Sequence, residues 1–148
     1  MRLLALSLIL VCCMSCRHTG NGLLTSPHPD DAKIVFVCAS DFEDVTYSFQ
    51  TNRGALRRTP RWKSDAEFPP LSPRRAGRAA LLRAQQLRPD VQKWRLESIC
   101  LDESGDDAWY YLFTFARGDI PITGLPQFLQ VPVLMDGLAL PATIPENK

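Results

Sequence analysis

The 148-residue sequence predicts an α+β domain in which an antiparallel sheet of about four to six strands carries one main helix on one face. Two observations predict this class. Short apolar runs rich in β-branched and aromatic residues recur along the chain, and turn-forming residues separate them. One stretch, residues 72–87, has the three- and four-residue apolar spacing of a helix. A hydrophobic content of 45% with 22% charged residues is ordinary for a globular domain.

The chain begins with a segment that has the layout of a secretory signal peptide. Arg2 precedes an apolar run from Leu3 to Met14, and the small residue Ser15 follows. A membrane-spanning helix needs about 20 apolar residues, so this run is too short to span. A cationic start, a short apolar core and a small residue before the cut are typical of a cleaved leader. We therefore assign residues 1–15 to a signal peptide and expect export.

The end of this leader, Met14-Ser15-Cys16, resembles a bacterial lipoprotein signal, in which the cysteine is lipidated and becomes the new N-terminus. The resemblance implies a lipid anchor on Cys16 and a place in the bacterial cell envelope, either periplasmic or on the outer membrane. Such an anchor would hold the domain at a membrane surface. The lipoprotein pattern prefers Leu three positions before the cysteine, where this chain has Cys13, so simple cleavage and secretion is the alternative.

Residues 16–32 predict a tether, because Gly, Asn, Ser, Thr and Pro dominate there without a sustained period. The tether ends in Pro-His-Pro-Asp-Asp at residues 27–31, which spells the start of a metal-dependent deacetylase motif. In those enzymes the motif follows a strand, and a later histidine completes the zinc shell. Here a polar tether precedes it, and no histidine follows His28. We interpret the motif as the boundary before a single domain at 33–148.

The domain opens with a predicted hairpin. Residues 33–39 form a compact apolar run that predicts a buried strand, and residues 45–50 alternate as a half-buried strand does. Residues 40–44 would form the turn. The next segment, 51–71, carries prolines among many charges and predicts a long irregular loop. Its basic residues around Trp62 are interpreted as a solvated surface.

The main helix is predicted from Ser72-Pro73, because a serine hydroxyl caps free N–H groups and proline suits the first helical position. Pro89 ends the helix. Four small or apolar residues recur on one face and predict the side that packs on the sheet. They are Ala76, Ala80, Ala84 and Leu87.

Three further strands are predicted at 93–101, 108–115 and 128–135. The apolar alternation of the first strand changes phase near Glu97-Ser98, which indicates a bulge. The strand at 108–115 is the strongest signal in the chain, with an aromatic residue at every second position. Pro132 predicts that the last strand lies at an edge or bulges, since proline cannot donate a hydrogen bond. Asp136-Gly137 predicts a tight turn into a return strand at 138–140.

The unit from Pro70 to Leu140 resembles PepSY-like domains and other small secreted bacterial modules. The resemblance rests on the stretches LSPRRAGRAALLRAQQL, KWRLESICL, AWYYLFTF and VPVLMDG, which follow a helix–strand–strand–strand order. It covers about half of the chain. It implies a binding or inhibitory module of the cell envelope rather than an enzyme.

Catalysis is not expected from the residue types present. The chain has two histidines, His18 and His28, both within the predicted tether, and it has no Gly-rich phosphate loop. We expect no cofactor, and a net charge of +1 argues against a nucleic-acid partner. The alternative is a small metal-dependent enzyme or a metal-binding factor that uses the acidic turns at 41–44 and 102–107.

The remaining candidates concern thiols and binding. Cys38 and Cys100 could form one disulfide in an exported protein, or stay as free buried thiols. Tyr110 and Leu112 alternate with a core-facing aromatic row, so they face the other side of the sheet and form a candidate partner surface. Trp62 is a third candidate for that surface. The predicted partner is an unidentified protein or peptide.

Overall fold

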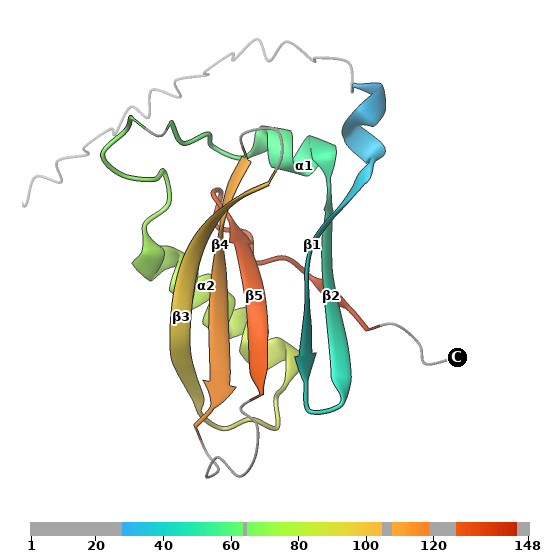
Figure 1. The fold of residues 1–148 in the computed structure, drawn as a ribbon, viewed down its shortest axis with the longest axis vertical. Helices are drawn as coiled ribbons and strands as arrows, with labels where there is room; N and C mark the ends of the chain where they lie inside the picture. The colour runs from blue at the N-terminus through green and yellow to red at the C-terminus, as the bar shows by residue number, and fades with distance from the viewer. Residues whose placement is uncertain (1–27, 64, 105–107, 119–126, 145–148) are drawn as a thin grey trace, which may run out of the picture.

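The computed structural model describes residues 28–63, 65–104, 108–118 and 127–144 (Figure 1). The elements in chain order are η1 (Pro29–Ala32), β1 (Ile34–Phe42), β2 (Val45–Asn52), α1 (Arg53–Arg58), α2 (Pro73–Leu87), β3 (Trp94–Ser104), β4 (Ala108–Arg117), β5 (Phe128–Leu134) and β6 (Ala142–Thr143). Two antiparallel three-stranded sheets result. We call β1-β2-β6 the first sheet and β3-β4-β5 the second sheet. Within the described residues, no helix is both long enough and apolar enough to cross a bilayer.

The prediction of one sheet with four to six strands is wrong, and the outer edge of β5 shows why. The carbonyl of Pro132 faces this edge and accepts from Leu140 N at 3.0 Å, while Leu134 N donates to Leu138 O at 3.0 Å. The chain's own return segment, 138–140, therefore occupies the upper half of the edge. Because N–H and C=O of one strand residue point to the same side, the missing N–H of Pro132 also falls here. A ladder of backbone hydrogen bonds between β5 and β1 therefore cannot continue along this edge beyond Pro132.

The two sheets instead meet through side chains at the lower end of β5. The buried Ser40 of β1 donates through Oγ to Phe128 O at 2.9 Å and accepts from Gln130 N at 2.9 Å. One hydroxyl thus satisfies two edge groups that a neighbouring strand would satisfy in a continuous sheet. Beside it, Glu43 N donates to the side-chain oxygen of Gln127 at 2.6 Å. Figure 1 shows β1 and β5 side by side, with the two sheets following one another around the molecule.

The predicted hairpin is confirmed as β1 and β2. Its two turn residues, Glu43 and Asp44, have φ angles of +48° and +63°. Positive φ at both positions matches the twist of a two-residue hairpin turn. The register shifts between Phe36 and Cys38, so β1 carries a bulge that its continuous apolar run did not reveal.

The predicted irregular loop 51–71 begins with regular structure instead. β2 runs to Asn52, whose side chain accepts from Ala55 N at 2.7 Å and caps helix α1. One carboxylate from the N-terminal side also stabilises this helix, because Arg57 donates to Asp31 at 3.1 Å. A local cap from Asn52 and an ion pair with the distant Asp31 therefore order a segment whose charged composition predicted a solvated loop.

The Pro-His-Pro-Asp-Asp motif forms part of the folded domain. Its last residues are η1, in which His28 Nδ1 accepts from Asp30 N at 3.3 Å and the Asp31 carboxylate accepts from His28 N at 3.0 Å. The motif is a capped turn that contacts α1. The domain thus begins about four residues before the predicted boundary at 33. Residues 1–27, with the predicted leader, Cys16 and most of the tether, lie outside the described residues.

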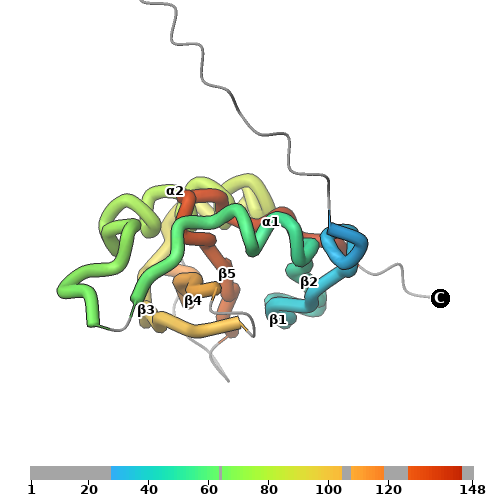
Figure 2. The backbone as a smooth tube through the Cα atoms, turned by 90° about the horizontal axis from the view of Figure 1, so that it is seen from above, coloured from blue at the N-terminus to red at the C-terminus, as the bar shows by residue number. Residues whose placement is uncertain are grey.

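Helix α2 is confirmed, with its predicted cap and buried face. Ser72 Oγ accepts from Arg75 N at 3.3 Å, and the three predicted alanines are fully buried. The helix lies over β4 and β5, on one side of the sheets (Figure 2). A Cβ at Gly77 would lie 3.2 Å from Phe113, so small residues allow the helix to lie close to the sheet. The aromatic residues beneath it continue into the first sheet through Phe42, Tyr47, Phe49, Phe113 and Phe115.

The second sheet confirms three predicted strands and corrects one turn. The bulge falls between Leu96 and Ser98, as the phase change predicted. β3 extends to Ser104, so Asp102 and Glu103 belong to the strand rather than to an acidic turn. The predicted return strand at 138–140 is reduced to one bridge with β5, and the chain then adds the short β6 to β2.

Candidate functional site

The strands of both sheets present two different faces. On β4, Phe113 lies against α2, and the alternate residues Tyr110 and Leu112 point to the other side. On β1, Phe36 is registered with Gln50, and the adjacent residue of β2, Phe49, is buried on the core side together with Tyr47. Phe36 therefore points away from the core, and so does Ile34. We call the face away from α2 the open face.

Two large apolar side chains of β1 are exposed on the open face. Ile34 is 62% exposed and Phe36 is 59% exposed. The sequence predicted a buried strand at 33–39, which is wrong for these two residues. A continuous apolar run does not reveal which side chains a partner element covers, and the bulge after Phe36 changes the alternation further. Reasoning from the sequence missed both residues as candidates.

The second sheet contributes the predicted candidates to the same face. Cys100 is exposed and registered with Leu112, while Leu112 and Tyr110 are half-buried. Burial raises the pKa of Tyr110, and the Asp102 carboxylate and then the Cys38 thiolate, which forms only at high pH, raise it further. Tyr110 thus lies close enough to Asp102 of β3 and to Cys38 of β1 for an electrostatic interaction with each. Because β1 packs beside β5, the exposed residues of the first sheet lie next to the second sheet.

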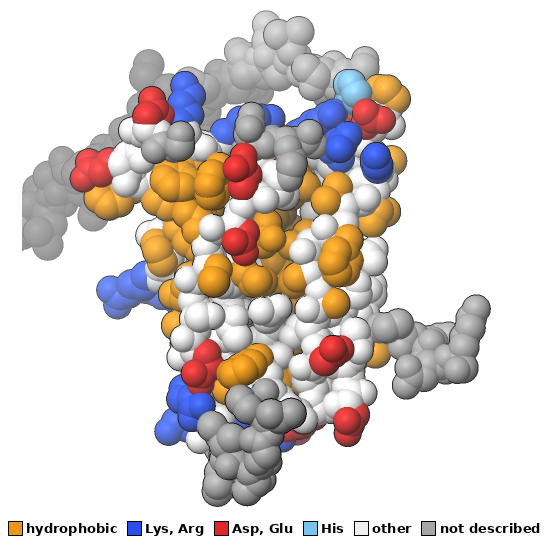
Figure 3. All heavy atoms as spheres, viewed as in Figure 1, with side chains coloured by type: hydrophobic (Ala, Val, Ile, Leu, Met, Phe, Trp, Pro, Cys, Tyr) orange, Lys and Arg blue, Asp and Glu red, His pale blue; other side chains and the backbone are white. Residues whose placement is uncertain are grey.

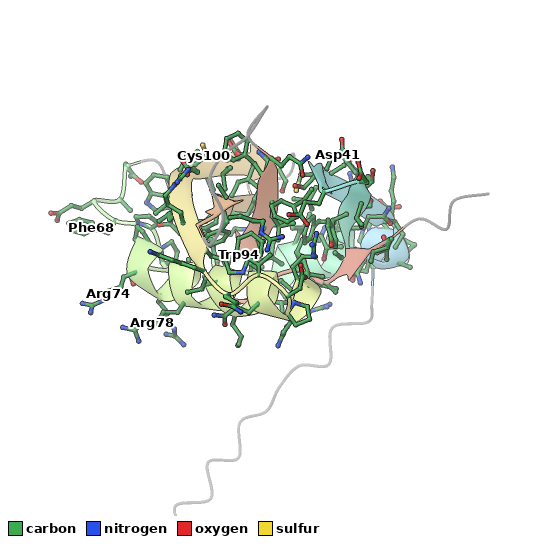
Figure 4. All side chains as sticks on the ribbon, turned by 90° about the horizontal axis from the view of Figure 1, so that it is seen from below. Asp41, Phe68, Arg74, Arg78, Trp94 and Cys100 are labelled. Carbon is green, nitrogen blue, oxygen red and sulfur yellow. The ribbon has the colours of Figure 1, made fainter. Side chains whose placement is uncertain are left out.

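Between the exposed residues of β1 and the second-sheet residues, the same face carries two side chains of β5. Pro132 and Leu134 are registered with Leu112 and Tyr110, and both are buried. Figure 3 shows hydrophobic side chains gathered over the upper half of the open face, with acidic side chains among them and Lys or Arg toward the margins. Figure 4 places Asp41 and Cys100 on this side of the molecule. The open face is apolar with acidic neighbours.

The structure does not bring Trp62 to this face. The Trp62 ring packs edge-on against Trp109, with centroids 5.0 Å apart, and its Nε1 donates to Ala66 O at 3.2 Å. Trp109 alternates in step with Phe113, so it lies on the α2 side of β4. Trp62 therefore packs the connection between α1 and α2 onto the sheet.

The two cysteines are free in the structure. Cys38 is half-buried on β1, and Cys100 is exposed on β3, with β4 and β5 between their strands. Three strand spacings amount to about 14 Å. A disulfide needs Cα atoms within about 7 Å. Burial raises the pKa of Cys38 to about 11, which keeps this thiol protonated at neutral pH.

The acidic residues do not assemble a metal site in the described part of the chain. Asp102 and Glu103 are consecutive in β3 and point to opposite faces. Among the residues that the structure describes, no three His, Cys, Asp or Glu side chains gather as metal ligands would. Asp106 and Asp107, which the metal-binding alternative also uses, lie outside the described residues.

A charged cluster lies at the lower end of the molecule. Arg117 donates to Glu43 at 2.7 Å, and Arg88 contacts both Glu43 and Asp90. The Arg117 hydrogen bond, followed by that of Arg88, holds the pKa of Glu43 below its ordinary value of 4.5, although burial opposes the shift. Arg88 also lies over the Phe42 ring, 5.1 Å from its centroid. The cluster ties the β1–β2 turn to α2 and β4, so its role is structural.

Comparisons of this chain with protein-family models, with curated proteins and with solved structures give no match. The open face remains the site that the geometry offers for binding. It joins Ile34 and Phe36 of the first sheet to Tyr110, Leu112 and Cys100 of the second sheet.

Proposed function

We propose that this protein is an exported, non-catalytic module of the bacterial cell envelope that binds a protein or peptide on its open face. The observation that carries the proposal is the exposure of Ile34 and Phe36 on strand β1. Full burial of such a side chain contributes about 1.5–3 kcal/mol. A partner that covers both, and the half-buried Tyr110 and Leu112 beside them, would gain a hydrophobic contact that the isolated domain lacks.

Charge indicates what kind of partner suits this face. Asp41 and Asp102 are the acidic residues associated with it through Figure 4 and through the pKa of Tyr110. An apolar segment flanked by Lys or Arg would complement both the hydrophobic side chains and the carboxylates. The same carboxylates would repel an anionic lipid surface. We therefore infer a protein or peptide partner for the open face rather than a bilayer.

The start of the described chain is consistent with attachment to an anchor. η1 directly precedes β1, and the Asp31–Arg57 pair fixes it against α1. A lipid on Cys16 would thus connect through the tether to the end of β1 that carries Ile34. Labelling with a radioactive fatty acid should mark the wild-type chain and not Cys16→Ser. Unlabelled wild-type protein would remove the anchor from the proposal and leave secretion.

Binding at the open face is tested with a photo-crosslinking amino acid placed at single positions in cells that make the full chain. We expect position 36 to form a discrete adduct with another protein. The matched control is position 82, because Leu82 is 57% exposed on α2, away from the open face. Wild-type competition should abolish the adduct, and competition with Phe36→Ser should not. Equal adducts at both positions, or none at position 36, would contradict the proposal.

A further inference from the structure

The outer edge of β3 is a second surface with the means to bind a partner. β3 has 11 residues and pairs with β4 along one edge only. In the described residues, no other strand pairs with its opposite edge. Such an edge presents backbone N–H and C=O groups in a row, and another extended chain can pair with them.

The middle of this edge lacks the usual protection against pairing. Residues 98–101, Ser-Ile-Cys-Leu, carry neither charge nor proline. Charges lie at both sides of this stretch, with Arg95 and Glu97 before it and Asp102 and Glu103 after it. The bulge between Leu96 and Ser98 also interrupts the regular register of β3 just before this stretch. Charges and bulges discourage indiscriminate pairing of long strands, while a short central segment stays available.

An apolar strip follows this edge on the α2 side. The helix lies over β4 and β5, which leaves Leu96 49% and Ile99 43% exposed. Ile99 is registered with Phe113, and Phe113 contacts the helix at Gly77. Leu81 follows Gly77 by four residues and therefore lies on the same side of the helix, where it is 37% exposed. Leu81, Leu96 and Ile99 thus flank the free edge.

The helix beside this strip is basic. α2 contains four arginines and no acidic residue. Arg74 and Arg78 precede Leu81 by seven and three residues, so the three share one stripe of the helix. Figure 4 shows Arg74 and Arg78 pointing away from the body of the molecule. Among the described residues, no carboxylate pairs with either arginine.

We propose that residues 98–101 of β3 accept an extended, acidic segment of a partner protein as an added strand. The backbone of that segment would pair with the β3 edge. Alternate apolar side chains would lie on Leu81, Leu96 and Ile99, and its Asp or Glu residues would lie beside Arg74 and Arg78. Backbone pairing supplies affinity in this mode of recognition, and the flanking side chains supply specificity. The site lies along the β3 edge and the α2 side; it shares Cys100 with the open face but does not require a partner there.

The first test selects from a random heptapeptide library on the immobilised full chain. We expect sequences in which Asp or Glu accompany apolar residues at every second position. Arg74→Glu should weaken binding of the selected peptide by about fivefold, the effect of one exposed charge pair worth about 1 kcal/mol. Arg75→Glu is the matched control, because it makes the same charge change in the same helical turn on another side of the helix. An equal loss in both variants would contradict the proposal.

The second test addresses the backbone. In an added strand, only alternate amides of the peptide point toward β3. N-methylation of one alternate set should abolish binding, and methylation of the other set should leave it within twofold. Binding that tolerates either set would overturn strand addition. Failure to select any peptide, or selection of peptides without acidic residues, would overturn the proposal as well, and a dimer formed through β3 would assign the edge to a second copy.

Discussion

The two faces of the sheets carry similar apolar side chains, but these side chains are buried on one face and exposed on the other. Phe113, on the face covered by α2, is fully buried, whereas Phe36, on the open face, is 59% exposed. Both are phenylalanines within β-strands. Intrinsic strand preference is therefore the same for both, and the difference comes from what packs above them. The alanine stripe of α2 lies close enough to cover one face, and no described element covers the side chains of Ile34 and Phe36.

This difference indicates how stability and binding are divided in the domain. Residues on the covered face contribute to the free energy of folding through close packing. Ile34 and Phe36 on the open face gain little from folding, because they remain largely in water. Their apolar character is then available for a partner. The division can be tested by making equivalent changes on both faces.

The largest effect is expected from one substitution made on each face. Phe113→Ala should lower the free energy of unfolding by about 3–5 kcal/mol, because it removes a fully buried ring beneath α2. Phe36→Ala should change it by less than about 1 kcal/mol, since the ring is mostly in water. Urea denaturation of both variants measures the difference. A loss above 2 kcal/mol in Phe36→Ala would mean that the open face also stabilises the fold.

An intermediate effect is expected at the joint between the sheets, which holds the two parts of the open face together. Ser40→Ala removes a hydroxyl that bonds both Phe128 O and Gln130 N, and it leaves both groups near a buried methyl. The free energy of unfolding should fall by about 1–3 kcal/mol. Amide exchange at Gln130 should also become faster. Ser98→Ala, an exposed serine on β3, is the control and should have little effect.

Local signals predicted most of the single elements. Ser72-Pro73 and the alanine spacing located α2, and the phase change near Glu97 located a bulge. These features depend on residues that are neighbours in the sequence. The division into two sheets depends on Ser40 meeting Phe128, 88 positions away, and local patterns do not encode such a contact.

The candidate site was predictable only in part, for the same reason. Tyr110 and Leu112 followed from alternation within one strand, and the structure places them on the open face. Phe36 was missed because burial depends on a covering element rather than on the strand itself. Trp62 was misplaced because its partner, Trp109, lies on the other side of β4. Helix α1 was missed although its cap, Asn52, is local, because the Asp31 that pairs with its Arg57 is 26 residues away.

The smallest effect is expected from the charged cluster that supports the same joint. Arg117 and Arg88 lower the pKa of Glu43 in the folded protein below 4.5, so the folded state holds the ionised carboxylate. The resulting stabilisation is present above pH 4.5 and is lost as the pH falls through the lowered pKa. Glu43→Gln should cost about 1 kcal/mol at pH 7, since partial exposure weakens these charged bonds. Unfolding curves at pH 7 and pH 3 measure both effects.

The control for this cluster is Asp44→Asn, which removes a neighbouring carboxylate from the same turn. No arginine among the described residues pairs with Asp44. If the joint depends on the ionised Glu43, the stability lost between pH 7 and pH 3 should shrink in Glu43→Gln and persist in Asp44→Asn. An unchanged pH dependence in Glu43→Gln would leave Ser40 as the main link between the sheets. The position of Phe36 relative to Tyr110 would then depend on contacts that do not change with pH, namely those of Ser40 and of Glu43 N with Gln127, and Ser40→Ala should weaken the joint at any pH.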